Sequence, residues 1–217
     1  FFLFDSVHLL KCVRNNWLSQ KDSDQTFIYP CIVNDSIAKA CFSHIRQLYN
    51  SEKDNIVKLA PNLTYKSLYP TSIERQNVKL ALKVFDERTA VALVHFGRSS
   101  NTDLNGDNEF ISIIVKMWKI LNVKSPNKGA FKRDSDSFPI RDLTDSRLTF
   151  LRDFHTWLCK WDSLPKIGRQ GCLSAETMFA LKHTIITILE LVPYLLNELN
   201  LSYVLLGKFQ TDNVMMT

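Results

Sequence analysis

Apolar residues recur every three or four positions along most of this 217-residue chain, and this spacing constrains the fold more than any other feature. Residues 110–121 (FISIIVKMWKIL) give the clearest example, because their apolar side chains would share one face of a helix. The spacing predicts helices over residues 7–17, 36–49, 71–96, 110–121, 148–161 and 174–199. The sequence therefore predicts a mainly α protein.

Local signals set several of the predicted boundaries. The sequence Thr71–Glu74 (TSIE) is a capping box, which predicts the start of the helix over 71–96. Residues 97–108 and 122–145 are polar and rich in turn-forming residues, so they predict loops. Pro193 should kink or split the last helix, and residues 27–29 allow one short extended piece.

The two ends of the chain differ from its helical middle. Phe1–Phe4 is an apolar run that predicts the end of a buried strand, and Asp5 follows it directly. Tyr203–Leu206 predicts a second strand, followed by a turn into another helix. A helical insertion in a strand-based domain would have this order of elements. We therefore expect a piece of a longer protein, whose two ends lie near each other in the parent fold.

Composition excludes some classes of protein. The net charge of +5 and the pI near 8.9 are mildly basic, which permits contact with phosphates without requiring it. The five cysteines are odd in number and never spaced as CxxC, so a disulfide framework is not expected. The apolar stretch 185–206 contains Glu190, Pro193 and Asn197, which favours a buried helix pair over a membrane span.

Asp5 is the first candidate functional residue. A carboxylate at the end of a buried strand is a suitable ligand for Mg²⁺, which demands near-ideal oxygen geometry. Ribonuclease-H-like nucleases and transposases hold magnesium in this way. The alternative is that Asp5 only caps the helix that follows it.

Two further patterns have both a functional and a structural interpretation. The segment KSPNKGAFKRD, residues 124–134, could contact phosphates through Lys124, Lys128, Lys132 and Arg133, or could be a solvated loop. It is not a P-loop, because GxxxxGK[ST] is absent from the chain. The pairs Cys41/His44 and His155/Cys159 have spacings that zinc accepts, but a closed site needs four ligands.

Three stretches together resemble the P-element-type transposases, which include the THAP-domain transposases. Phe4–Asn16 (FDSVHLLKCVRNN) is close to the family pattern F-D-x-x-H-L-x-K-x-x-R-N-N. Met117–Gly129 (MWKILNVKSPNKG) resembles the family's F-D-x-x-N-S/V region. Tyr203–Asn213 (YVLLGKFQTDN) resembles the segment that re-enters the catalytic domain. The resemblance spans the whole chain in the family's order.

The resemblance implies a helical GTP-binding insertion domain within a ribonuclease-H-like α/β domain. It divides the chain into an end of the first catalytic segment at 1–19, the insertion domain at 20–201 and the start of the second catalytic segment at 202–217. The parent protein would cleave and join DNA at transposon ends in the nucleus, with Mg²⁺ and GTP. The resemblance implies no membrane, and it leaves open whether the protein forms a homo-oligomer.

The resemblance also assigns roles to individual residues. Asp5 falls on the second catalytic Asp and is a metal ligand. Asp212 falls on an acidic residue that helps to hold the magnesium of the nucleotide, and Asn122 falls in the guanine-contacting region. The nearest candidates for contact with the phosphates are Lys66, Arg75 and Lys79.

Two positions depart from the family pattern. Met215 stands where the catalytic Glu is expected, and a thioether cannot replace a carboxylate on Mg²⁺. Lys119 stands where the base-reading Asp is expected, and an ammonium has only donors to offer guanine. We therefore expect a transposase fragment that does not cut DNA alone. The alternative is a non-enzymatic helical module, a co-opted or decayed transposon remnant, that binds protein or nucleic acid through residues 124–134.

Overall fold

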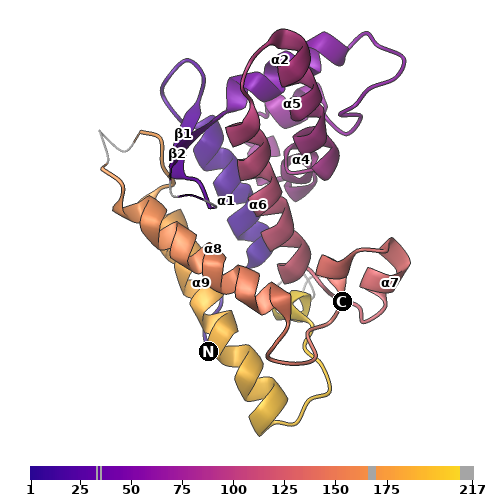
Figure 1. The fold of residues 1–217 in the computed structure, drawn as a ribbon, viewed down its shortest axis with the longest axis vertical. Coiled ribbons are helices and arrows are strands. Elements are labelled where there is room, and N and C mark those ends of the chain that lie inside the picture. Colours follow the sequence, from indigo (N-terminus) through magenta and orange to yellow (C-terminus); the bar gives the residue numbers. More distant parts are fainter. Residues whose placement is uncertain (33, 35, 166–169, 211–217) are drawn as a thin grey trace. The chain divides into compact units, whose positions relative to one another are not determined.

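The computed structural model describes residues 1–32, 34, 36–165 and 170–210 of the chain. Asp212 and Met215, for which the sequence predicts roles, lie outside the described residues. The described part is mainly helical, as predicted, with one small sheet (Figure 1).

Most elements of the described chain are helices. In chain order, the α-helices are α1 (Ser6–Leu18), α2 (Phe42–Glu52), α3 (Tyr65–Leu68), α4 (Val78–Val84), α5 (Glu87–Ser100), α6 (Asn105–Leu121), α7 (Lys128–Lys132), α8 (Ser146–Ser163) and α9 (Ala175–Pro193). The strands are β1 (Thr26–Pro30) and β2 (Ile37–Cys41). Short 3₁₀-helices cover Glu74–Gln76, Ser135–Ser137 and Leu206–Phe209, and a π-helical turn covers Tyr194–Glu198.

The chain forms two compact units. Unit one comprises Phe1–Leu9, Lys116–Lys160 and Ala175–Thr217, and unit two comprises Leu10–Val115 and Trp161–Ser174. The predicted domain boundaries at residues 19/20 and 201/202 stay a prediction.

Unit two is built around a buried cluster of aromatic side chains. Trp17 of α1 stacks on Phe27 of β1, with ring centroids 5.8 Å apart, and meets Phe110 of α6 edge to face at 4.9 Å. Phe42 and Phe85 also contact the Trp17 ring. These side chains are almost completely buried, and such pairs add to the stabilisation that burial alone provides. The cluster is the core of unit two.

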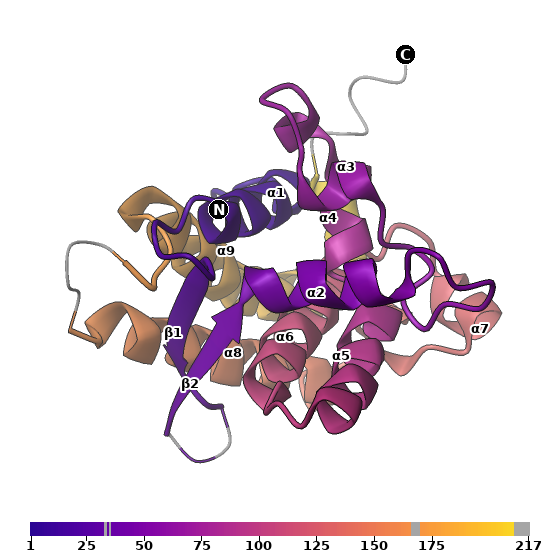
Figure 2. The same ribbon diagram turned by 90° about the horizontal axis from the view of Figure 1, so that it is seen from above.

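The hairpin formed by β1 and β2 is fixed in register on this core. The strands pair antiparallel, with Thr26 opposite Cys41 and Pro30 opposite Ile37, and β2 leads directly into α2 (Figure 2). The indole Nε1 of Trp17 donates to the carbonyl of Ala40 at 3.1 Å, and that of Trp161 donates to Ile28 at 2.7 Å. Both indoles thus satisfy backbone carbonyls of the hairpin.

Two predicted helices of unit two differ from the structure. Residues 37–41 form β2 instead of the first half of a helix, because they pair with β1 and bury Ala40 against the core. The predicted helix over 71–96 is divided into a 3₁₀ turn, α4 and α5. Asp86 ends the continuity because its carboxylate accepts the Arg88 N–H at 2.8 Å and caps α5.

Unit one contains the end of α6, the first part of α8, and α9, with its core on the apolar faces of these helices. One isolated antiparallel bridge joins Ile140 to Val204. The buried hydroxyl of Thr184 on α9 accepts the Phe4 N–H at 3.2 Å. Residues 175–198 are long and apolar enough to cross a membrane by length and composition, a test that a core helix also passes. The buried face of α9, threonines included, supports its interpretation as a core helix.

The strands predicted at the two ends are largely wrong. Phe1–Phe4 has no regular structure, and the rings of Phe1 and Phe2 are 68% and 63% exposed. A strand needs a neighbour to accept its hydrogen bonds, and none of the described residues pairs with this segment. Tyr203–Leu206 is reduced to the single bridge at Val204. The π-helical turn after Pro193 agrees with the predicted break in the last helix.

Candidate functional site

Asp5 lies immediately before α1 in unit one and is half-buried. Its carboxylate Oδ1 accepts the Val7 N–H at 2.9 Å, and its carbonyl accepts the Leu9 N–H at 2.9 Å. The structural interpretation of Asp5 as a helix cap is therefore confirmed. A metal-binding role for the same carboxylate stays a prediction.

The two ends of the described chain meet beside Asp5. The Gln210 Nε2 donates to the Ser6 Oγ at 2.5 Å and to the Leu121 carbonyl at 3.1 Å, and Gln210 is buried. The expectation that the chain ends approach each other is confirmed as far as Gln210. The predicted ligand Asp212 lies two residues further on, outside the described residues.

Asn122 follows the last residue of α6 in unit one. Its N–H donates to Trp118 at 3.0 Å, and its carbonyl accepts from the Lys128 Nζ at 2.7 Å. Gly207 packs closely on the same turn, where an added Cβ would lie 2.8 Å from the Val123 carbonyl oxygen. Asn122 is thus held on a rigid turn between the end of α6 and the 3₁₀-helix that starts at Leu206.

Lys119, one turn before Asn122, forms an ion pair with Asp134 at 3.4 Å. Burial alone would raise the pKa of Asp134, but hydrogen bonds from Ser137 and Lys119 hold it below its ordinary value. Asp134 is therefore ionised at neutral pH, and Lys119 has a carboxylate partner within the protein.

The predicted phosphate-contacting residues lie around the 3₁₀ turn Glu74–Gln76 in unit two. The predicted capping box is present, because Thr71 N–H donates to Glu74 Oε2 at 3.0 Å and Glu74 N–H donates to Thr71 Oγ1 at 3.3 Å. Lys66 forms an ion pair with the same carboxylate at 3.3 Å. Lys79, in the first turn of α4, is exposed.

Arg14 is a further cation of this region that sequence reasoning did not assign. Its side chain on α1 is completely buried, and its guanidinium donates to the Arg75 carbonyl at 2.9 Å and to Asn15 Oδ1 at 2.8 Å. Among the described residues its NH1 has no partner. Burial, and then the charge of Arg75, lower the pKa of Arg14 to about 10. An anion near Arg14 and Arg75 would therefore be strongly stabilised.

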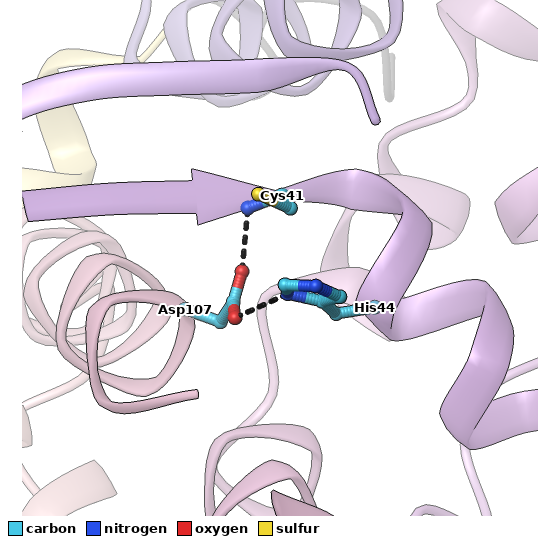
Figure 3. A group of neighbouring side chains, drawn as sticks. All are labelled: Cys41, His44 and Asp107. Carbon is cyan, nitrogen blue, oxygen red and sulfur yellow. Dashed lines mark hydrogen bonds and ion pairs between the residues drawn. The ribbon is translucent and has the colours of Figure 1, made fainter. Parts of the chain in front are cut away.

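A cluster of possible metal ligands lies elsewhere in unit two (Figure 3). Asp107, at the start of α6, accepts the Cys41 N–H at 2.5 Å and contacts the His44 Nδ1 at 2.8 Å. The ligand atoms of Cys41, His44 and Asp107 lie within 4.8 Å of one another. Gly106 permits the close approach, because a Cβ there would lie 2.2 Å from the Lys39 carbonyl oxygen.

Electrostatics favour a structural role for this cluster. The hydrogen bond to the Asp107 carboxylate raises the pKa of His44, whereas burial lowers it. The side chain of Asp107 is only 2% exposed and is fully engaged by His44 and the Cys41 N–H. Three groups are also fewer than the four ligands of a closed zinc site. His155 and Cys159, the second predicted pair, belong to unit one.

Comparison with known proteins defines the class of this domain. A family model described as the TNP-like, GTP-binding insertion domain matches residues 7–134, more than half of the chain. The chain therefore belongs to the family of TNP-like, GTP-binding insertion domains.

A solved structure extends the comparison to nearly the whole chain. The chain in the Drosophila P element transposase strand transfer complex has the same fold, with a TM-score of 0.75 and 18% sequence identity. The match covers 99% of this chain and 44% of that chain, so this chain spans less than half of the transposase polypeptide. The predicted resemblance to P-element-type transposases is confirmed. A comparison with curated protein sequences gave no significant match.

Proposed function

We propose that this chain is the nucleotide-binding insertion domain of a P-element-like DNA transposase and that it binds GTP together with Mg²⁺. The observation that carries the proposal is the family match over residues 7–134, which includes Lys66, Arg75, Lys79 and Asn122. In the parent protein, the domain would act on transposon ends in the nucleus.

The basic residues of unit two support contact with phosphates. Arg75 and the buried Arg14 have their charges close together, and no carboxylate of the described residues pairs with either of them. Two such cations repel each other until an anion lies between or beside them. Lys66 and Lys79 are two further exposed cations of unit two. A triphosphate fits this set of donors better than a neutral ligand does.

One candidate magnesium ligand fits a metal held mainly by the nucleotide. Mg²⁺ in nucleotide sites keeps several waters and is bound by phosphates and one or two carboxylates. The resemblance assigns Asp212 to that ion. Asp5 is proposed instead as a ligand of the catalytic magnesium of the parent transposase, and its carboxylate also caps α1.

The same residues argue against DNA cleavage by this chain alone. A two-metal phosphodiester displacement needs several carboxylates around ions that stabilise the attacking and leaving oxygens. Within these 217 residues the resemblance provides Asp5 and places Met215 at the position of the Glu. We expect no magnesium-dependent strand transfer by the purified chain, and product above the level of an Asp5→Asn control would contradict this part of the proposal.

Calorimetry with the full chain tests nucleotide binding directly. GTP and ATP are titrated with Mg²⁺ present into the wild type, Arg75→Ala and Asn122→Ala, with the exposed Arg88→Ala as a matched charge control. We expect GTP to bind the wild type and the Arg88 variant alike and the other two variants about tenfold more weakly. Absence of heat with either nucleotide, or equal binding by all variants, would remove the proposed site.

A further inference from the structure

The segment between α6 and α8 in unit one carries a basic surface that is separate in sequence from the proposed phosphate contacts Lys66, Arg75 and Lys79. We call residues 124–133 the basic loop; it contains Lys124, Lys128, Lys132 and Arg133. Its centre is the short helix α7, with Phe131 on the outer side. Lys132 and Arg133 are exposed, and Lys124 and Lys128 are half-buried.

The charges of the basic loop are close enough to act on one another. Burial lowers the pKa of Lys128, and Lys132, Lys124 and Lys119 lower it further by repulsion. Asp134 opposes this effect, but its carboxylate already pairs with Lys119 and accepts from Ser137. The loop therefore has an excess of positive charge and attracts polyanions.

The loop is held in one shape before any partner binds. An added Cβ at Gly129 would lie 2.5 Å from the ring of Phe138, so α7 packs directly on that ring. The Lys128 Nζ donates to the Asn122 carbonyl at 2.7 Å, and Arg133 ends α7 in a left-handed conformation with φ of 52°. A partner would pay little ordering entropy on binding such a surface.

Phe131 is the unusual member of the loop. Its ring is 90% exposed, although it lies one residue before Lys132 and three residues after Lys128 on a well-packed helix. An exposed apolar ring on a segment rich in basic residues suits a partner that has both flat apolar faces and negative charge. Nucleic acid bases and phosphates have this combination, and stacking of bases on aromatic rings beside basic side chains is how single strands are bound.

We propose that the basic loop, with Phe131 as its stacking platform, is a binding site for single-stranded DNA. In duplex DNA the base faces are stacked on one another and cannot meet the ring, which favours a single strand. The cations are also distributed along ten residues, which suits a chain of phosphates better than one nucleotide. That the strand is DNA and not RNA rests on the proposed function. The location of the site is argued from the basic loop alone.

Fluorescence anisotropy with a labelled single-stranded oligothymidylate and the full chain tests the site. Phe131→Leu keeps the apolar volume and removes the π face, whereas Phe131→Trp enlarges the π face. We expect the Leu variant to bind about tenfold more weakly and the Trp variant at least as tightly as the wild type. A matched duplex should bind more weakly than the single strand and should respond little to either substitution.

Salt dependence separates phosphate contacts from general charge. Lys132→Gln/Arg133→Gln should flatten the slope of log affinity against log salt by about 1.4, since each contact on a single strand contributes about 0.7. Arg88→Gln/Arg98→Gln, which removes the same charge from exposed positions of α5, should leave the slope unchanged.

The outcomes distinguish this site from nucleotide binding. Loss of DNA binding in the loop variants with unchanged GTP heats supports the proposal, and so does the same loss in a chain that binds no GTP at all. The proposal is overturned if the wild type does not bind the single strand, or if the α5 control weakens binding as much as the loop variant. It is also overturned if the loop variants lose GTP affinity and keep DNA affinity.

Discussion

Gln210 and Ser6 are 204 residues apart in sequence and share a buried hydrogen bond of 2.5 Å. The same Gln210 amide donates to the carbonyl of Leu121, the last residue of α6, where helix carbonyls have no partner within the helix. Three segments, the start of α1, the end of α6 and the turn after Leu206, are therefore joined by one side chain within unit one. Two residues with predicted roles lie next to these contacts in sequence: Asp5 precedes Ser6, and Asn122 follows Leu121.

Replacement of Gln210 should loosen this junction. Gln210→Ala removes both donors and leaves the buried Ser6 hydroxyl and Leu121 carbonyl without them, so we expect a loss of about 1–3 kcal/mol in the free energy of unfolding. Denaturant titration monitored by circular dichroism measures the loss. The exposed neighbour Lys208→Ala is the control and should change stability by less than about 0.5 kcal/mol. Equal free energies of unfolding for the two variants would show that the Gln210 hydrogen bonds do not stabilise the fold.

The ion pair between His44 and Asp107 predicts a pH dependence of stability. Since Asp107 raises the pKa of His44 in the folded state, the protonated imidazole contributes stability that is fully present below its ordinary pKa of about 6.5. That contribution is lost as pH rises through the raised pKa. The charged group Asp24 also favours the imidazolium, and the Cys41 thiol lies beside the pair.

Comparison of the wild type with His44→Gln isolates the contribution of the His44–Asp107 pair to stability. The wild type should be more stable than His44→Gln at low pH within the native range, and the difference should shrink as pH rises above about 6.5. His155 titrates with the opposite sign, because burial lowers its pKa, but it is common to both chains and cancels in the difference. A difference that stays constant or grows with pH would contradict the predicted role of the pair.

Helical spacing was sufficient for the elements whose partners are other helices. The apolar stripe of α6 and the positions of α8 and α9 follow from the sequence, because one face of each packs on a core. The helix predicted over residues 36–49 was wrong in its first part. Ile37 and Cys41 also fit a helical stripe, and only pairing with β1 makes residues 37–41 a strand. Phe1–Phe4 misled in the opposite direction, since an apolar run forms a strand only beside another strand.

The candidate site shows the same limit. Lys66, Arg75 and Lys79 could be named from sequence because the family resemblance implies basic residues in this stretch, and these are the nearest ones. Arg14 could not be assigned, since its meaning depends on burial against the carbonyl of Arg75, 61 residues away. Asp107 was missed for the same reason: no local pattern links it to Cys41 and His44, and a fold must bring them together.

The indole of Trp17 should dominate the stability of unit two. Trp17→Ala removes a completely buried side chain from the aromatic cluster, and we expect a loss of about 3–5 kcal/mol. Trp17→Phe keeps most of the packing but removes the donor to the Ala40 carbonyl, so a smaller loss of about 1–3 kcal/mol is expected. Thermal or denaturant unfolding orders the two variants against Ile73→Ala, whose side chain is 86% exposed and should matter little. If Trp17→Phe were as unstable as Trp17→Ala, the whole loss of stability would be due to the hydrogen bond to Ala40, and the predicted contribution of packing would be wrong.

Exchange of the charges at Lys119 and Asp134 should change base selectivity. A carboxylate at position 119 can accept from the N1–H and the N2 amine of guanine, whereas the lysine offers donors only. Because Asp134 now pairs with Lys119, a new aspartate alone would face it with like charge; the test is therefore Lys119→Asp/Asp134→Asn. We expect the ratio of GTP to ATP affinity to rise about tenfold in calorimetric titrations, since unmatched buried donors and acceptors discriminate between bases. Asp134→Asn alone is the control, and an equal rise in that variant would assign the selectivity to release of Lys119 and not to the new carboxylate.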